Sequence, residues 1–100
     1  MLRLVIRSQT PEESVLEAHG WIVGADVALL EREGEQLRHR RGRLVLELGG
    51  VRSVDRDGLE LLRRWQGEGL SLCGGSRFVR ALLAESGLIS TSRSPSTGKA

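Results

Sequence analysis

The sequence predicts an α/β domain with a mixed, largely parallel sheet of about four strands and three helices, in the order β-β-α-β-α-β-α. Short apolar runs typical of strands alternate with longer segments in which apolar residues recur every three or four positions, as on one face of a helix. The first two runs precede any helical segment, so we expect them to pair as an antiparallel hairpin. Each later strand follows a helix, which favours parallel pairing through right-handed crossovers.

The hairpin is predicted within residues 2–19. Leu2, Leu4 and Ile6 alternate with the other residues of Leu2–Arg7, as expected of a half-buried strand. A Thr-Pro-Glu-Glu turn signal follows at residues 10–13, and Val15–His19 supplies the second strand.

The first helix is predicted from Asp26 to near His39. Its apolar stripe consists of Val27, Leu30, Gly34 and Leu37. Charged residues on the other side include Glu31, Arg32, Glu33 and Glu35. The basic cluster that follows comprises Arg38, His39, Arg40, Arg41 and Arg43. Because cations are favoured at the negative end of a helix dipole, we interpret this cluster as a solvated helix end in preference to a phosphate-binding patch.

The central strand is predicted over Leu44–Leu48, an apolar run interrupted only by Glu47 and typical of a strand covered on both faces. Gly49 and Gly50 are predicted to end it.

A strand-to-helix junction is predicted next. Asp55 and Asp57 precede a second helix, expected from Asp57 to about Gln66, and either carboxylate is placed to accept hydrogen bonds from the free N–H groups of the first turn. The buried stripe of this helix is expected to carry Leu59, Leu62 and Trp65.

The last strand and helix follow a glycine-rich stop. Leu70–Cys73 reads as a short strand, and Ser76 is placed to cap a third helix that ends at Gly87. We expect Ile89 to be the last structured residue, so that residues 1–89 form one domain. Residues 90–100 are rich in Ser, Thr, Pro and Gly, which predicts a disordered tail.

Composition narrows the class of protein. The chain has 100 residues, 39% of them hydrophobic and 28% charged, as expected of one globular domain. No apolar run approaches the ~20 residues that cross a bilayer, and the first residues lack a signal peptide's apolar stretch, so we expect a cytoplasmic protein without membrane insertion. The net charge of +2 and the absence of aromatic residues among the arginines of the basic cluster argue against a nucleic-acid partner.

No catalytic or metal-binding set is evident in the sequence. Asp55 lies where a phospho-accepting aspartate would lie, but the acidic pair and the lysine that such a site needs are missing, since Lys99 is the only lysine. His19 and His39 are far apart and form no metal-ligand spacing. Cys73, the only cysteine, has no adjacent base and is interpreted as a small buried hydrophobe. We therefore predict no enzyme activity and no cofactor.

The chain resembles the STAS domain family, which includes anti-sigma-factor antagonists and the cytoplasmic ends of sulfate transporters. The family pattern is an apolar strand, an Asp, a short turn, and then Asp-Ser-Ser/Thr-Gly-Leu opening a helix; LVLELGGVRSVDRDGL, at residues 44–59, follows it without a gap. Gly20 matches a family glycine after the second strand, and Leu70–Leu88 resembles the closing strand, helix and Gly-Leu. The resemblance covers about Val15 to Leu88.

The chain departs from the family pattern at the switch position. Antagonists of the family carry a phosphorylatable Ser or Thr directly after the Asp that corresponds to Asp55, and this chain has Arg56 there. Arginine accepts no phosphate, and its charge is opposite to that of a phosphoserine. Asp57 replaces the next Ser or Thr, and Glu47 replaces the strand Asp. Ser53 is nearby but does not align with the phosphate acceptor. Phosphoregulation at the usual position is therefore not expected.

The resemblance implies a non-enzymatic regulatory domain that binds a protein partner, of the anti-sigma-factor or kinase type. The predicted partner-binding residues are Asp55, Arg56, Asp57, Gly58 and Glu60. Asp55 and Asp57 as plain helix caps, with Arg56 solvated, are the competing interpretation. An alternative function is a small-ligand or anion sensor that uses the helix N-termini at Asp57 and Ser76. The sequence leaves the oligomeric state open.

Overall fold

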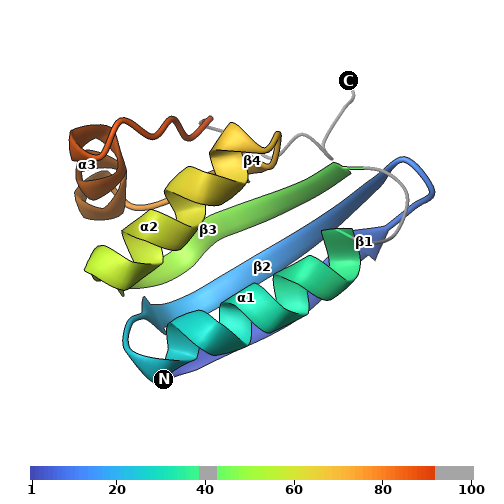
Figure 1. Cartoon of the computed structure of the whole chain (residues 1–100), viewed down its shortest axis with the longest axis horizontal. Helices are drawn as coiled ribbons and strands as arrows, with labels where there is room; N and C mark the ends of the chain where they lie inside the picture. Colours follow the sequence, from blue (N-terminus) through green and yellow to red (C-terminus); the bar gives the residue numbers. More distant parts are fainter. Residues whose placement is uncertain (39–42, 92–100) are drawn as a thin grey trace.

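A computed structural model describes residues 1–38 and 43–91 of the chain (Figure 1). Four strands form one sheet in the order β1-β2-β3-β4, and their bounds are β1 Leu2–Gln9, β2 Glu13–Ile22, β3 Arg43–Val54 and β4 Ser71–Cys73. β1 is antiparallel to β2, while β3 and β4 are parallel to their neighbours. The helices are α1 Ala25–Arg38, α2 Arg56–Gly67 and α3 Arg77–Glu85. The predicted mixed sheet and the order β-β-α-β-α-β-α are confirmed.

The main core lies between the sheet and the helices. Alternate residues of β3, namely Leu44, Leu46 and Leu48, pack in one cluster with Leu30 of α1 and Leu62 of α2, and Val79 and Leu83 of α3 belong to the same cluster. Figure 1 shows α1 and α2 running side by side over the sheet. The intervening strand residues Val15, Val45 and Cys73 form a second, small cluster, because successive side chains of a strand point to opposite faces.

The buried stripes of the helices follow the sequence pattern. All four residues predicted for α1, from Val27 to Leu37, are buried. In α2, Leu62 and Trp65 are buried as predicted, whereas Leu59 is only half-buried and Leu61 takes its place in the core. The predicted start at Asp57 is one residue late, since α2 begins at Arg56.

The prediction that Gly49 and Gly50 end the central strand is wrong. β3 continues through both glycines to Val54. The pairing with β2 shifts register twice, between Glu17 and His19 and between Gly20 and Trp21. Such register shifts let a long strand curve without ending. Glycines tolerate the bend because they have no Cβ atom.

The hairpin is longer and less evenly buried than predicted. β2 runs from Glu13 to Ile22, beyond the predicted Val15–His19 on both sides. In β1, Leu2 is buried and Leu4 is half-buried, but Ile6 is 52% exposed beside a register shift at Arg7. β1 is the edge strand of the sheet, and no strand lies on its outer side in the described part of the chain.

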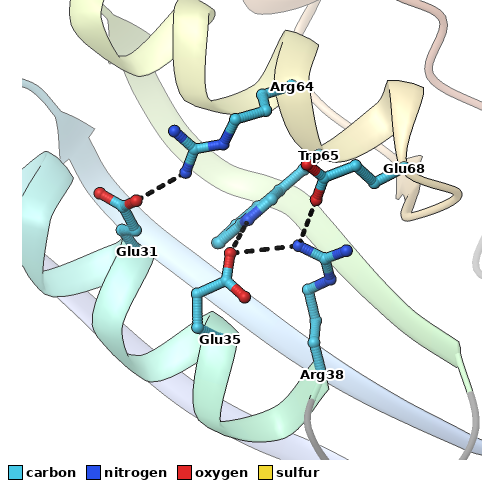
Figure 2. Close-up of polar contacts among 6 residues, drawn as sticks. All are labelled: Glu31, Glu35, Arg38, Arg64, Trp65 and Glu68. Carbon is cyan, nitrogen blue, oxygen red and sulfur yellow. Dashed lines mark hydrogen bonds and ion pairs between the residues drawn. The ribbon is translucent and has the colours of Figure 1, made fainter.

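Polar contacts fix α1 against α2 beside the core (Figure 2). Trp65 Nε1 donates to Glu35 Oε2 at 2.8 Å. Arg38 Nη1 lies 3.1 Å from the same carboxylate oxygen and 2.8 Å from Glu68 Oε1. Arg64 pairs with Glu31 at 2.6 Å. The basic residue Arg38 therefore serves helix packing, while His39, Arg40 and Arg41 of the predicted cluster lie outside the described part of the chain.

The described chain ends beside β4. Thr91 forms a parallel bridge with Cys73, Thr91 N donates to Leu72 O at 3.1 Å, and Gly74 N donates to Thr91 O at 2.8 Å. Ser90 Oγ donates to Gly74 O at 2.6 Å. Ser90 and Thr91, which the sequence assigns to the tail, are thus joined to the sheet; residues 92–100 lie outside the described part.

Candidate functional site

The junction between β3 and α2, residues 55–58, is built around the carboxylate of Asp55. Asp55 is the N-cap of α2, and its Oδ1 accepts from Gly58 N at 2.9 Å. Its Oδ2 accepts from Gly24 N, also at 2.9 Å. Gly24 precedes α1, so one side chain binds the first turn of α2 and the loop that leads from β2 into α1. Asp55 N donates to Ile22 O at 3.1 Å and joins the same two segments through the backbone.

These donors change the acidity of Asp55. The N–H groups of Gly24 and Gly58 hold the pKa of the Asp55 carboxyl below its ordinary value, because they bind the charged form. Asp55 is therefore a carboxylate at neutral pH, and both of its oxygens are engaged. Its role in the structure is that of a cap and a link between loops.

Gly58 lies where no side chain fits. A Cβ at this position would be 2.7 Å from both Ile22 O and Val54 Cγ1, far inside van der Waals contact. Gly58 is buried, and it lets the first turn of α2 approach the end of β2 closely.

The predicted partner-binding residues thus fall into two groups. Asp55 and Gly58 are held within the fold, whereas Arg56, Asp57 and Glu60 are exposed on the first turns of α2. Among the residues that the structure describes, these three form no ion pair or side-chain hydrogen bond. Of the five predicted residues, only these three have exposed side chains without such contacts.

The N-terminus of α3, the second place predicted for an anion, is capped by its own side chain. Ser76 Oγ accepts from Val79 N at 3.1 Å. The caps at Asp55 and Ser76 each occupy one first-turn donor that an anion would use. In addition, the Asp55 carboxylate repels a second negative charge at the α2 end.

Cys73 is fully buried in β4, as predicted for a small packed residue. Burial raises the pKa of its thiol to about 11, with the Glu47 carboxylate adding to the shift. The thiol is therefore protonated at neutral pH and a poor nucleophile.

His19 lies in β2 beside an acidic neighbour. His19 Nε2 is 3.0 Å from Glu17 Oε1, and Arg7 from β1 contacts the other oxygen of the same carboxylate. Together His19 and Arg7 lower the pKa of Glu17, with the His19 hydrogen bond as the largest cause. Within residues 1–38 and 43–91, no group of three His, Cys, Asp or Glu side chains has the arrangement of a metal site.

Sequence reasoning missed two exposed residues near the junction. Trp21, near the end of β2, is 43% exposed, and the guanidinium of Arg52 lies 5.8 Å from the centre of its ring. A Trp two residues beyond the predicted second strand was the available signal, because Trp and Arg are among the residues enriched at binding hot spots.

None of the helices that the structure describes has the length and apolar character needed to cross a membrane.

Comparison with known proteins agrees with the fold. The family model described as "Mlab, STAS domain" matches residues 5–90, a span that contains most of the hairpin, all three helices and the β3–α2 junction. No curated protein matches the chain. The resemblance indicated by the junction motif is confirmed, and the chain belongs to the STAS domain family.

Proposed function

We propose that the chain is a non-enzymatic, cytoplasmic regulatory domain that binds a protein partner through Arg56, Asp57 and Glu60 on the first turns of α2. Membership of the STAS family supports an anti-sigma-factor antagonist-like regulatory role. Asp55 and Gly58 belong to the same site as its support, because they fix the position of the turn that carries the three exposed side chains.

The observation that carries the proposal is the exposure of Arg56 at a rigidly held helix start. Asp55 fixes this turn with two hydrogen bonds of 2.9 Å, so Arg56 and Asp57 are presented in one arrangement with little loss of backbone entropy on binding. A guanidinium suits bidentate contact with a carboxylate of the partner. Because position 56 carries a fixed positive charge, binding is not switched by phosphorylation there.

A substitution at position 56 tests this function. Arg56→Asp puts a negative charge at the place where the family adds phosphate. The helix dipole favours an acidic residue there and offsets the repulsion from Asp55 and Asp57, so α2 should remain folded. Arg32→Asp on α1, where Arg32 is 67% exposed, is the matched control for the same change of charge. Proteins retained by the wild-type chain are identified by quantitative mass spectrometry, and the Kd of the purified partner is then measured by calorimetry.

We expect Arg56→Asp to weaken binding roughly tenfold or more and Arg32→Asp to leave it unchanged. Equal affinity of the wild type and Arg56→Asp would remove the α2 start from the function. Weaker partner binding by both variants would indicate a general effect of charge and would also contradict the proposal.

A further inference from the structure

One edge of the long strand β3 lacks a neighbouring strand over half of its length. β4 pairs only with Val45, Leu46 and Glu47, although β3 runs on to Val54. In the described part of the chain, β2 pairs with this later half on one side, and no strand pairs with it on the other. Figure 1 shows how short β4 is beside β3. We call residues 48–54 the open edge.

A shallow groove of about 400 Å³ lies at the open edge. It is lined by Gly49, Gly50, Val51 and Arg52 of β3 and by Ser76 at the start of α3. Two of these residues are glycines, which add no side chain of their own; the Glu47 carboxylate lies against Gly49 and the His19 ring lies against Gly50. The N–H of Gly49 is already bound by the Glu47 carboxylate at 3.0 Å, which marks the end of the groove nearest β4.

The rim of the groove is cationic. Arg52 lines it directly, Arg77 follows Ser76, and the stem of Arg80 lies close to Gly75. None of these three arginines has an ion pair among the described residues, in contrast to Arg38 and Arg64 between α1 and α2. The positive end of the α3 dipole lies at the same place. Away from the Glu47 carboxylate at its other end, the surface therefore complements negative charge.

We propose that the open edge of β3 binds an acidic, extended segment of a partner protein as an added strand. An uncovered strand edge supplies main-chain hydrogen bonds, and flanking side chains supply specificity, in this mode of peptide recognition. Arg52, which lines the groove, and Arg77 and Arg80 at the start of α3 select acidic side chains. The residues of this surface differ from Arg56, Asp57 and Glu60, and the proposal does not depend on the function of those three.

The probe is a fluorescein-labelled peptide of alternating glutamate and valine, roughly eight residues long, the length of an ordinary strand. Binding to the full chain is followed by fluorescence anisotropy, and the contact site is mapped by amide chemical shifts. A lysine-valine peptide tests charge selection. Two further glutamate-valine peptides are N-methylated on one or the other set of alternate residues, which removes the backbone donors on one side only.

Saturable binding of the acidic peptide is expected, with the largest amide shifts within residues 48–54 and at Arg77. Arg52→Glu combined with Arg77→Glu should weaken it roughly tenfold or more, while Arg32→Glu should not. One N-methylated peptide should fail to bind and the other should bind normally. An Arg56→Asp variant should bind the peptide as well as the wild type, which separates this surface from the α2 start.

The proposal is overturned if the acidic peptide does not bind, if both N-methylated peptides bind equally, or if the shifts lie elsewhere. Tighter binding of a single-stranded oligonucleotide of similar length, lost in the same double variant, would assign the edge to nucleic acid instead. Thermal unfolding of each variant, followed by circular dichroism, verifies that a loss of binding is not a loss of fold.

Discussion

The indole of Trp65 lies directly against the backbone of Gly34, so that a Cβ built on Gly34 would be 2.3 Å from Cη2 of the ring. Trp65 is fully buried, and its N–H is bound to Glu35, one residue further along α1. This contact brings α1 and α2 close together over the sheet. The contact also explains why α1 has a glycine at position 34, although glycine has a low intrinsic propensity for helices.

Gly34→Ala should therefore destabilise the protein. Alanine is favoured over glycine in a helix by about 1 kcal/mol, but the added methyl group meets a ring that is buried and hydrogen-bonded and has nowhere to move. Overpacking of this kind costs roughly 1–3 kcal/mol. Urea unfolding followed by circular dichroism measures the change. Gly67→Ala is the control, since no atom lies within 4 Å of a Cβ there, and it should be neutral or stabilising. Equal stabilities of the two variants would contradict the proposed contact.

Glu35→Ala should lower the stability of the fold more than Glu31→Ala does. Removing Glu35 leaves the indole N–H of a buried Trp without its acceptor, which costs roughly 1–3 kcal/mol. Glu31 pairs with Arg64 on an exposed surface, where such pairs contribute roughly 0–1 kcal/mol. Chemical unfolding at low and high salt separates the two: the small Glu31 effect should largely vanish with added salt, whereas most of the Glu35 effect should remain, since only its pair with Arg38 is screened. A cost for Glu31→Ala as large as that for Glu35→Ala would refute this assignment.

Asp55 should make stability depend on pH in the acid range. Its pKa is lowered in the folded state by the N–H groups of Gly24 and Gly58, so the folded chain binds the proton less readily than the unfolded chain. The stabilisation by the Asp55 carboxylate is fully present above the pKa of this carboxyl in the unfolded chain, which is about 3.9. It is lost as the pH falls through the lower pKa of the carboxyl in the folded chain. Asp55→Asn keeps the shape without the charge, so its deficit relative to the wild type should shrink as the pH falls from about 5 to 2. Thermal unfolding at each pH measures that deficit; a constant deficit would show that the charge has no role.

Cys73 should react slowly in the folded protein. Burial raises the pKa of its thiol to about 11, and the side chain has no exposed surface. A thiol reagent that absorbs light on reaction should label the chain at least roughly 100-fold faster in concentrated urea than in buffer at pH 8. Since Cys73 is the only cysteine, the signal has one source. Similar rates in both solutions would mean that β4 opens readily.

Much of the fold follows from local pattern. The stripe of α1 was predictable down to Gly34, because helical spacing alone places it among Val27, Leu30 and Leu37. What the pattern could not predict is why a glycine is required there, since its partner Trp65 lies on another helix. The continuation of β3 past Gly49 was missed for a related reason: paired glycines favour turns locally, whereas pairing with β2 keeps them in the strand.

The candidate site was predictable in part. The cap at Asp55 follows from a carboxylate three residues before the free N–H of Gly58. Its second bond, to Gly24, joins residues far apart in the sequence and depends on tertiary structure. The rim of the open edge was likewise hidden, because Arg52 and the start of α3 come to line one groove only in the folded chain.

The two bonds of Asp55 also bear on how the domain moves. A single side chain binds both the loop after β2 and the first turn of α2, so a movement of the Asp55 carboxylate breaks both hydrogen bonds at once. We therefore expect the two segments to open together in local unfolding. If a partner binds the α2 start as proposed, we expect amide exchange at Gly24 to slow, and by reciprocity a change in that loop should alter the affinity for the partner by the same free energy.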